Sequence, residues 1–153
     1  MKRPVIFLDF DGVLNTEQYQ EQLFIEGKPT KDRWGPLFDP KAVGNLRRIL
    51  DATDSIIVVS SSWRYIHRLS SLRLMWSARN LPGETIDTIP CGATYISHGE
   101  DIEYWLERNN RPQYVIIDDL DDFFPEQLDN FVQTNPIVGI TDADAVKAID
   151  LLK

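Results

Sequence analysis

Three short runs of apolar residues, each ending abruptly in polar side chains, constrain the fold of this chain more than any other feature of its sequence. The runs cover residues 5–8, 56–59 and 114–117. They are rich in β-branched side chains and are apolar at consecutive positions, whereas a half-buried strand alternates apolar and polar residues. Strands of this kind are buried on both faces, which is typical of a parallel sheet covered by helices.

Helical patterns separate these runs. Asp39 followed by Pro40 favours a helix start, and the residues after them carry a single apolar stripe. A second helix is expected over residues 63–80, before a Pro-Gly turn signal. A third is expected over about 98–109, opened by a Ser-x-x-Glu capping box that starts at Ser97.

The rest of the chain completes the expected architecture. A short strand is predicted over residues 136–140 and a final helix from Thr141 onward. Strands and helices in this order predict an α/β, three-layer, Rossmann-like fold with a central, mostly parallel sheet. We expect one domain over residues 1–153, with two flap insertions at about 16–38 and 82–96.

Charge and composition limit the ligands and the location of the protein. The net charge is −8, so the surface would repel a nucleic-acid backbone and no extended nucleic-acid binding is expected. The single cysteine, Cys91, fits a reducing compartment. No apolar run reaches the length of about 18 residues that a membrane span needs, and the first run is too short for a signal peptide. We therefore expect a cytoplasmic protein without a membrane partner.

The acids at the strand ends indicate a metal site. Asp9 and Asp11 follow the first run, and Asp118 and Asp119 follow the third. Side chains at positions i and i+2 of an extended chain face the same way, and Gly12 allows a tight turn just beyond them. Because the chemistry of such sheets collects at the carboxyl ends of the strands, we expect these carboxylates to converge. They would repel one another unless a proton or cation intervened, and Mg2+ is the natural cation.

A second polar cluster indicates phosphate chemistry. Ser60, Ser61 and Ser62 follow the second run, where a helix is expected to begin. Their hydroxyls and the first N–H groups of that helix would form a phosphate cradle, to which Arg64 would add a positive charge. Of the two inner carboxylates, one can attack phosphorus and the other can act as general acid and base. The three clusters together predict phosphoryl transfer.

Three segments carry a resemblance to a known family. Residues 9–14, Asp-Phe-Asp-Gly-Val-Leu, resemble the first motif of the haloacid dehalogenase (HAD) superfamily. Residues 56–61, an apolar strand ending in serine, resemble the second motif, and residues 115–119, an apolar strand ending in two acids, resemble the fourth. The resemblance spans nearly the whole chain and implies a phosphatase of the minimal-cap type, because the two insertions are short.

The resemblance implies a role for each acid. Asp9 would be the nucleophile that forms an aspartyl-phosphate, and Asp11 would be the general acid and base. Mg2+ would be held by the Asp9 carboxylate, the backbone carbonyl of Asp11 and Asp119. Asp118 would be a further metal ligand or, with Asp122, a supporting acid.

The third motif departs from the family pattern. A lysine or arginine normally lies between the second and fourth motifs and contacts the nucleophile and the phosphate, yet the sequence has no lysine between Lys41 and Lys147. Arg64 and His98 are the two candidate substitutes. Both are therefore candidate phosphate-binding residues, as is Gly12 of the first motif.

The motifs also suggest a substrate class. The phrase Ser-Ser-Ser-Trp-Arg resembles a Thr-Ser-Trp form in related small proteins, which favours Ser61 over Ser60 for the phosphate contact. Together with Asp-Gly-Val-Leu-Asn, which ends at Asn15, this phrase resembles phosphatase domains associated with RNA end repair. The expected substrate is a phosphorylated small molecule or the end of a nucleotide or nucleic acid.

Three other functions are alternatives to a phosphatase of small molecules. A catalytically weak or inactive HAD-fold module that binds phosphate or regulates a partner would account for the missing lysine. A nucleic-acid end phosphatase would work with a separate repair protein. A phospho-receiver is disfavoured, because residues 136–140 lack the lysine that ends a late strand of receivers.

Overall fold

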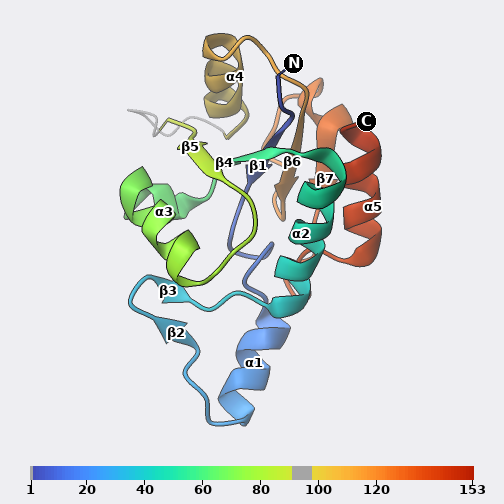
Figure 1. Cartoon of the computed structure of the whole chain (residues 1–153). Helices are drawn as coiled ribbons and strands as arrows, with labels where there is room; N and C mark the ends of the chain where they lie inside the picture. The colour runs from blue at the N-terminus through green and yellow to red at the C-terminus, as the bar shows by residue number, and fades with distance from the viewer. Residues whose placement is uncertain (1, 91–97) are drawn as a thin grey trace.

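The computed structural model describes residues 2–90 and 98–153, which contain a central sheet of five parallel strands covered by helices (Figure 1). Across the sheet the order is β5-β4-β1-β6-β7, and every neighbouring pair is parallel. In that order the strands are Thr85–Thr88, Ile56–Val59, Val5–Leu8, Tyr114–Asp118 and Phe131–Gln133. The three strands expected from the apolar runs are therefore neighbours, with β1 at the centre.

Alternate residues of each strand face opposite sides of the sheet, and each side has its own helical cover. Ile6 and Leu8 of β1 face the larger core, whereas Val5 and Phe7 face the smaller one. The larger core is covered by α2, α3 and α5, and the smaller one by α4: Pro40–Thr53, Leu69–Ala78, Asp142–Leu151 and His98–Arg108 respectively. These layers confirm the predicted three-layer α/β fold. Among the described residues, no helix is both long and apolar enough to cross a membrane.

Two helix starts follow the capping rules that the sequence suggests. Asp39 caps α2 with its carboxylate, and Pro40 lies in the first turn. Thr141 caps α5 through a reciprocal capping box. The α4 helix begins at His98 as expected, whereas the capping residue predicted for it, Ser97, lies outside the described residues.

The single helix predicted over residues 63–80 is wrong, because this stretch forms two helices. A 3₁₀ helix spans Ser62–Tyr65, and α3 starts only at Leu69. Ser61 caps the 3₁₀ helix, and the Arg64 side chain donates back to the carbonyl oxygens of Ser60 and Ser61 just after β4, so local contacts hold this short turn. The serine cluster therefore precedes a four-residue turn, not the N-terminus of a long α-helix.

The two edge strands of the sheet also differ from the sequence prediction. The strand predicted over residues 136–140 is wrong: β7 forms earlier, and a turn bridged by Asn135 and Gly139 follows it. A Cβ on Gly139 would lie 2.4 Å from the Val13 carbonyl oxygen, so this turn packs closely against the loop after β1. Residues Thr85–Thr88, expected within the second flap insertion, form the edge strand β5 of the central sheet.

The first insertion consists of α1 and a small hairpin. Helix α1 spans Glu17–Ile25, and the hairpin pairs β2, Lys31–Asp32, with β3, Gly35–Pro36. Figure 1 shows both at the end of the molecule toward which β1 runs. Arg79, just after α3, donates to both carboxylate oxygens of Asp32 and to the carbonyl oxygens of both β3 residues. The hairpin expected as a flap is therefore fastened to α3.

We expect Arg79→Met to loosen this hairpin. The change keeps an apolar stem but removes four hydrogen bonds, and a bond to a charged group contributes roughly 1.5–3 kcal/mol. Because Asp32 is partly exposed, water replaces much of these bonds, and thermal unfolding should show a net loss of only about 2 kcal/mol. Trypsin should cut after Lys31 and Arg33 several-fold faster. Arg48→Met, at an exposed position of α2, is the control. Equal effects of the two variants would contradict a fastening role for Arg79.

Candidate functional site

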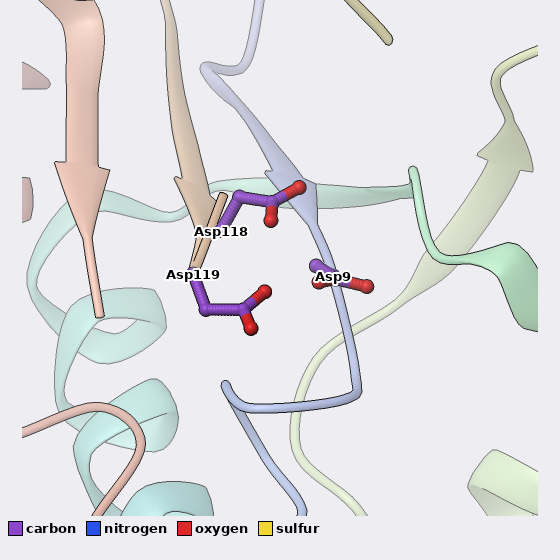
Figure 2. Close-up of side chains that lie close together, drawn as sticks. All are labelled: Asp9, Asp118 and Asp119. Atoms are coloured by element: carbon purple, nitrogen blue, oxygen red, sulfur yellow. The ribbon is translucent and has the colours of Figure 1, made fainter. Parts of the chain in front are cut away.

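The carboxyl ends of β1 and β6 bring three aspartates together. The parallel register pairs Leu8 of β1 with Ile117 of β6, so Asp9 and Asp118 leave the sheet side by side. Together with Asp119 they offer one carboxylate oxygen each, and these three oxygens lie within 4.8 Å of one another. Figure 2 shows the side chains of Asp118 and Asp119 directed toward Asp9 across the space between the two strand ends. The predicted convergence of strand-end carboxylates is therefore present for these three acids, whereas the prediction that Asp11 joins them is wrong.

Gly12 shapes the turn after β1. Its φ of +77° lies in the region that favours glycine, and a Cβ at this position would lie 2.6 Å from Asp119 Oδ2. The Gly12 carbonyl oxygen accepts a hydrogen bond from the Thr134 hydroxyl at 2.8 Å, which ties the turn to the segment after β7. The predicted tight turn is confirmed, and the missing side chain also lets the backbone approach the acidic cluster.

Burial and mutual repulsion disfavour ionisation of these carboxyl groups. Asp9 is 8% exposed and Asp118 is fully buried. Burial raises the pKa of Asp9 far above its usual range, and the neighbouring Asp118 raises it further. Burial also raises the pKa of Asp118, although the N–H of Leu120, which donates to Asp118 Oδ1 at 2.9 Å, opposes this shift. The site therefore favours a proton or a cation between the two carboxyl groups.

The donor set fits a hard divalent cation. All three side chains offer carboxylate oxygen, the ligand type that Mg2+ prefers. Asp118 Oδ2 is buried and accepts no hydrogen bond from any described residue. Within residues 2–90 and 98–153, no lysine or arginine forms an ion pair with any of the three aspartates. A cation would therefore supply the positive charge that these side chains lack.

The carboxylate of Asp11 lies apart from this cluster. Its Oδ1 accepts a hydrogen bond from Asn15 Nδ2 at 2.7 Å and another from Trp63 Nε1 at 3.0 Å. Asp11 is also exposed, in contrast to the buried Asp9. The structure thus separates the two acids of the first motif, with Asp9 in the three-carboxylate cluster and Asp11 held toward the 3₁₀ helix that follows β4.

The serine cluster lies at the end of β4, on the side of β1 opposite to β6. The Ser60 hydroxyl is fully buried and has no hydrogen-bond partner among the described residues. The Ser61 hydroxyl is also buried, and it accepts a hydrogen bond from the backbone N–H of Trp63 at 3.2 Å while keeping its own proton to donate. Ser62 is exposed. No described residue therefore accepts a hydrogen bond from either of these two buried hydroxyls.

Arg64 supports the serine loop from inside the protein. Its side chain is 1% exposed and pairs with Asp101 of α4 at 3.3 Å. The same guanidinium donates to the carbonyl oxygens of Ser60 and Ser61 at 2.7 and 2.9 Å. The guanidinium therefore faces the Asp101 carboxylate and the two serine carbonyl oxygens.

His98 approaches the acidic cluster from the start of α4. Its Nδ1 lies 4.0 Å from Asp118 Oδ2. Burial lowers the pKa of His98, and the positive charge of Arg64 lowers it further, so the imidazole is mainly neutral at neutral pH. The exposed Asp122 lies outside the three-carboxylate cluster and accepts a hydrogen bond from the backbone N–H of His98 at 3.3 Å.

Comparison with known families agrees with this geometry. A model of the HAD domain in Swiss Army Knife RNA repair proteins matches residues 5–145. The chain belongs to this HAD family. The match confirms the resemblance that the motifs carry, and it supports a phosphatase-type hydrolase. No curated protein and no solved structure matches the chain significantly.

Three side chains at this HAD site have contacts that the sequence does not predict. Trp63 and Asn15 donate to Asp11, and Asp101 pairs with Arg64. The contacts of Trp63 and Asp101 join residues 52 and 37 positions apart, so no local pattern encodes them. Only Asn15 could have been identified from the sequence, because it lies four residues after Asp11 of the first motif.

We expect Asp118→Asn to stabilise the metal-free protein at neutral pH. Asparagine keeps an oxygen that can accept from Leu120 N, and it removes one of the repelling charges. Folding raises the pKa of this carboxyl, so the wild type loses stability as the pH rises above about 4, where an unfolded aspartate ionises. Thermal unfolding at pH 7.5 in EDTA should show a higher Tm, by about 3 °C for each kcal/mol.

The stabilisation should shrink as the pH falls toward that of the unfolded carboxyl, because the wild-type charge is then progressively lost. Asp121→Asn, an exposed acid of the same loop, is the matched control and should leave the Tm unchanged. If Asp118→Asn lowers the Tm at both pH values, the site is not strained by charge repulsion.

Proposed function

We propose that this protein is a Mg2+-dependent phosphomonoesterase that acts through an aspartyl-phosphate on Asp9. The observation that carries the proposal is the convergence of Asp9, Asp118 and Asp119 at the ends of two adjacent parallel strands. One buried oxygen of this cluster has no hydrogen-bond partner among the described residues, which supports a bound cation. Membership of the HAD family supports the reaction class.

The proposed Mg2+ ligands are the carboxylates of Asp9 and Asp119 and the backbone carbonyl of Asp11, with Asp118 beside them. When bound, the cation neutralises charge on the phosphoryl group as it is transferred. Gly12 supports this arrangement, because any side chain at its position would collide with the Asp119 carboxylate. Asp118 Oδ1 is fixed by Leu120 N, which leaves Oδ2 free to face the ligands.

Two aspartates would divide the chemistry. Asp9 Oδ1 accepts a hydrogen bond from Phe10 N at 2.8 Å, so Oδ2 is the proposed attacking atom. Its bond to phosphorus forms while the bond from phosphorus to the leaving oxygen breaks, and Asp11 donates a proton to that oxygen. Asp11 then takes a proton from the water that hydrolyses the aspartyl-phosphate, which releases phosphate and regenerates both side chains.

The proposed donors to the phosphate oxygens are the buried hydroxyls of Ser60 and Ser61. Arg64 would act through them, since it donates to the carbonyl oxygens of the same two residues. His98, neutral and close to Asp118, would offer an N–H in place of a fixed charge. The N–H of Gly12 already donates to the Asn15 carbonyl oxygen, so it is not a proposed phosphate donor. Gly12 would instead contribute the tight turn and the close backbone approach that its missing side chain allows.

The proposed substrate is the phosphorylated end of an RNA or another nucleic acid. The family is named for RNA repair proteins. The first insertion is only a nine-residue helix and a hairpin of two-residue strands, which leaves room for a large substrate. The net charge of −8 disfavours contacts along a nucleic-acid backbone, and it is compatible with recognition of a terminal phosphate alone.

We expect Asp9→Asn to abolish hydrolysis of p-nitrophenyl phosphate. Loss of the nucleophile should lower kcat by about a thousandfold or more, and EDTA should do the same to the wild type until Mg2+ is restored. Asp51→Asn, at an exposed position of α2, should retain full activity. Activity that survives Asp9→Asn would overturn the proposal. Mg2+ binding without turnover on any phosphate ester would favour a non-catalytic phosphate-binding module.

We expect short RNAs with a terminal phosphate to be better substrates than p-nitrophenyl phosphate. Added contacts to the terminal nucleotide should raise kcat/KM by about tenfold, equivalent to about 1.4 kcal/mol of binding energy in the transition state. The dependence of kcat/KM on salt should be shallow, because few backbone phosphates are contacted. A clear preference for sugar phosphates over all nucleic-acid ends would instead identify a small-metabolite phosphatase.

A further inference from the structure

The carboxylate of Asp11 is held by two donors from different parts of the chain. Trp63 Nε1 donates to Asp11 Oδ1 at 3.0 Å, and Asn15 Nδ2 donates to the same oxygen at 2.7 Å. No described residue donates to Asp11 Oδ2. Both hydrogen bonds therefore fix one oxygen and the rotation of the carboxyl plane, while the other oxygen keeps its capacity to carry a proton.

The indole that makes one of these bonds is itself held firmly. Trp63 is 6% exposed. Its ring meets that of Phe10 edge to face at 5.2 Å and lies 5.6 Å from that of Phe38. A Cβ on Gly35 of the hairpin would lie only 3.1 Å from the indole edge. The indole is thus enclosed by the first motif on one side and by the hairpin on the other.

The hairpin side of this enclosure is fixed as well. The Arg79 guanidinium, which fastens β2 and β3 to α3, also lies over the rings of Phe38 and Trp63, at 4.7 and 5.7 Å from their centroids. His67 adds a contact from its Nε2 to the carbonyl oxygen of Trp34 at 3.1 Å. A continuous set of contacts therefore runs from the hairpin through the indole to Asp11.

We infer that Trp63 is a positioning residue for Asp11, which sets the direction in which Asp11 presents its proton to the leaving group. This inference rests on the proposed function. Trp63 does not touch the reacting atoms, and it acts by keeping Asp11 Oδ1 bound so that Oδ2 carries and delivers the proton. The hairpin in turn sets the position of the indole, so the first insertion contributes to the acid step.

Positioning of Asp11 should affect only the cleavage of the bond between phosphorus and the leaving oxygen. When Asp9 attacks, the electrons of the bond from phosphorus to the leaving oxygen pass to that oxygen, and the Asp11 proton neutralises it as an alcohol. A nitrophenolate leaves readily without a proton, whereas an alkoxide does not. Misplacing the proton of Asp11 should therefore slow the cleavage of alkyl phosphates and leave nitrophenyl phosphate almost unaffected.

Trp63→Phe tests this directly. The change keeps an aromatic ring against Phe10 and Phe38 and removes the N–H. Trp105→Phe is the matched control, since the indole of Trp105 is also buried and donates to a carboxylate, that of Asp87 at 2.8 Å, on the opposite side of the sheet. We would measure kcat/KM for β-glycerol phosphate and for p-nitrophenyl phosphate in both variants and the wild type.

The ratio of the two kcat/KM values is independent of the amount of folded enzyme, so it separates a positioning effect from a loss of stability. Trp63→Phe should lower the ratio of alkyl to nitrophenyl activity by roughly tenfold, part of the hundredfold or more that general acid catalysis contributes. Trp105→Phe should leave the ratio unchanged. Asp11→Asn should lower it furthest, because it removes the acid itself.

An unchanged ratio would overturn the inference. Equal loss on both substrates, which leaves the ratio as it is in Trp105→Phe, would make Trp63 a packing residue. If Trp63→Phe does not fold, Asn15→Ala removes the other donor to the same oxygen and must lower the ratio in the same direction. Because the proposed function is judged by the loss of activity in Asp9→Asn, its failure is distinguishable from a failure of this inference.

Discussion

Repulsion among three carboxylates at adjacent strand ends is the constraint on which the rest of the site depends. It arises from the sheet itself, because the parallel register of β1 and β6 carries Asp9 and Asp118 out of the core side by side. Both groups are buried, so neither repulsion nor desolvation is relieved by water. The apolar strands β1, β4 and β6 offset this cost, since their central residues are fully buried on both faces.

Placing the acids also requires a backbone that turns sharply and is then held. Gly12 makes the turn at a positive φ, and Thr134 and Gly139 fix it from the segment after β7. The Gly139 backbone approaches the Val13 carbonyl oxygen so closely that a Cβ there would lie 2.4 Å from it. The residues after β7 therefore hold the first motif in place. This packing accounts for the turn at residues 135–139, where the sequence predicts a strand.

The sequence predicts the parts of the fold that follow from burial and misses those that follow from long-range contacts. Central strands form apolar runs because both faces are covered, so β1, β4 and β6 were predictable. Three of the four residues of the edge strand Thr85–Thr88 are polar, so it has no such run. The short 3₁₀ helix before Leu69 is held by Arg64 contacts that no apolar pattern reveals. The three clustered acids were predictable from strand ends, whereas the hydrogen bond from Trp63 to Asp11 depends on packing against the hairpin.

The contacts of Arg64 also bear on the missing lysine. Its guanidinium is buried against Asp101 and the carbonyl oxygens of the serine loop, and the nearby His98 has a lowered pKa because it is buried beside that charge. A lysine in this part of a HAD site would bring a mobile positive charge to the nucleophile. In this chain Arg64 instead donates to the backbone of the serine loop, which is the proposed phosphate-binding loop. Under the proposed function, a bound cation would compensate the charge at Asp9 and Asp118. The affinity of the acidic cluster for Mg2+ would then be the property on which the proposed activity most depends.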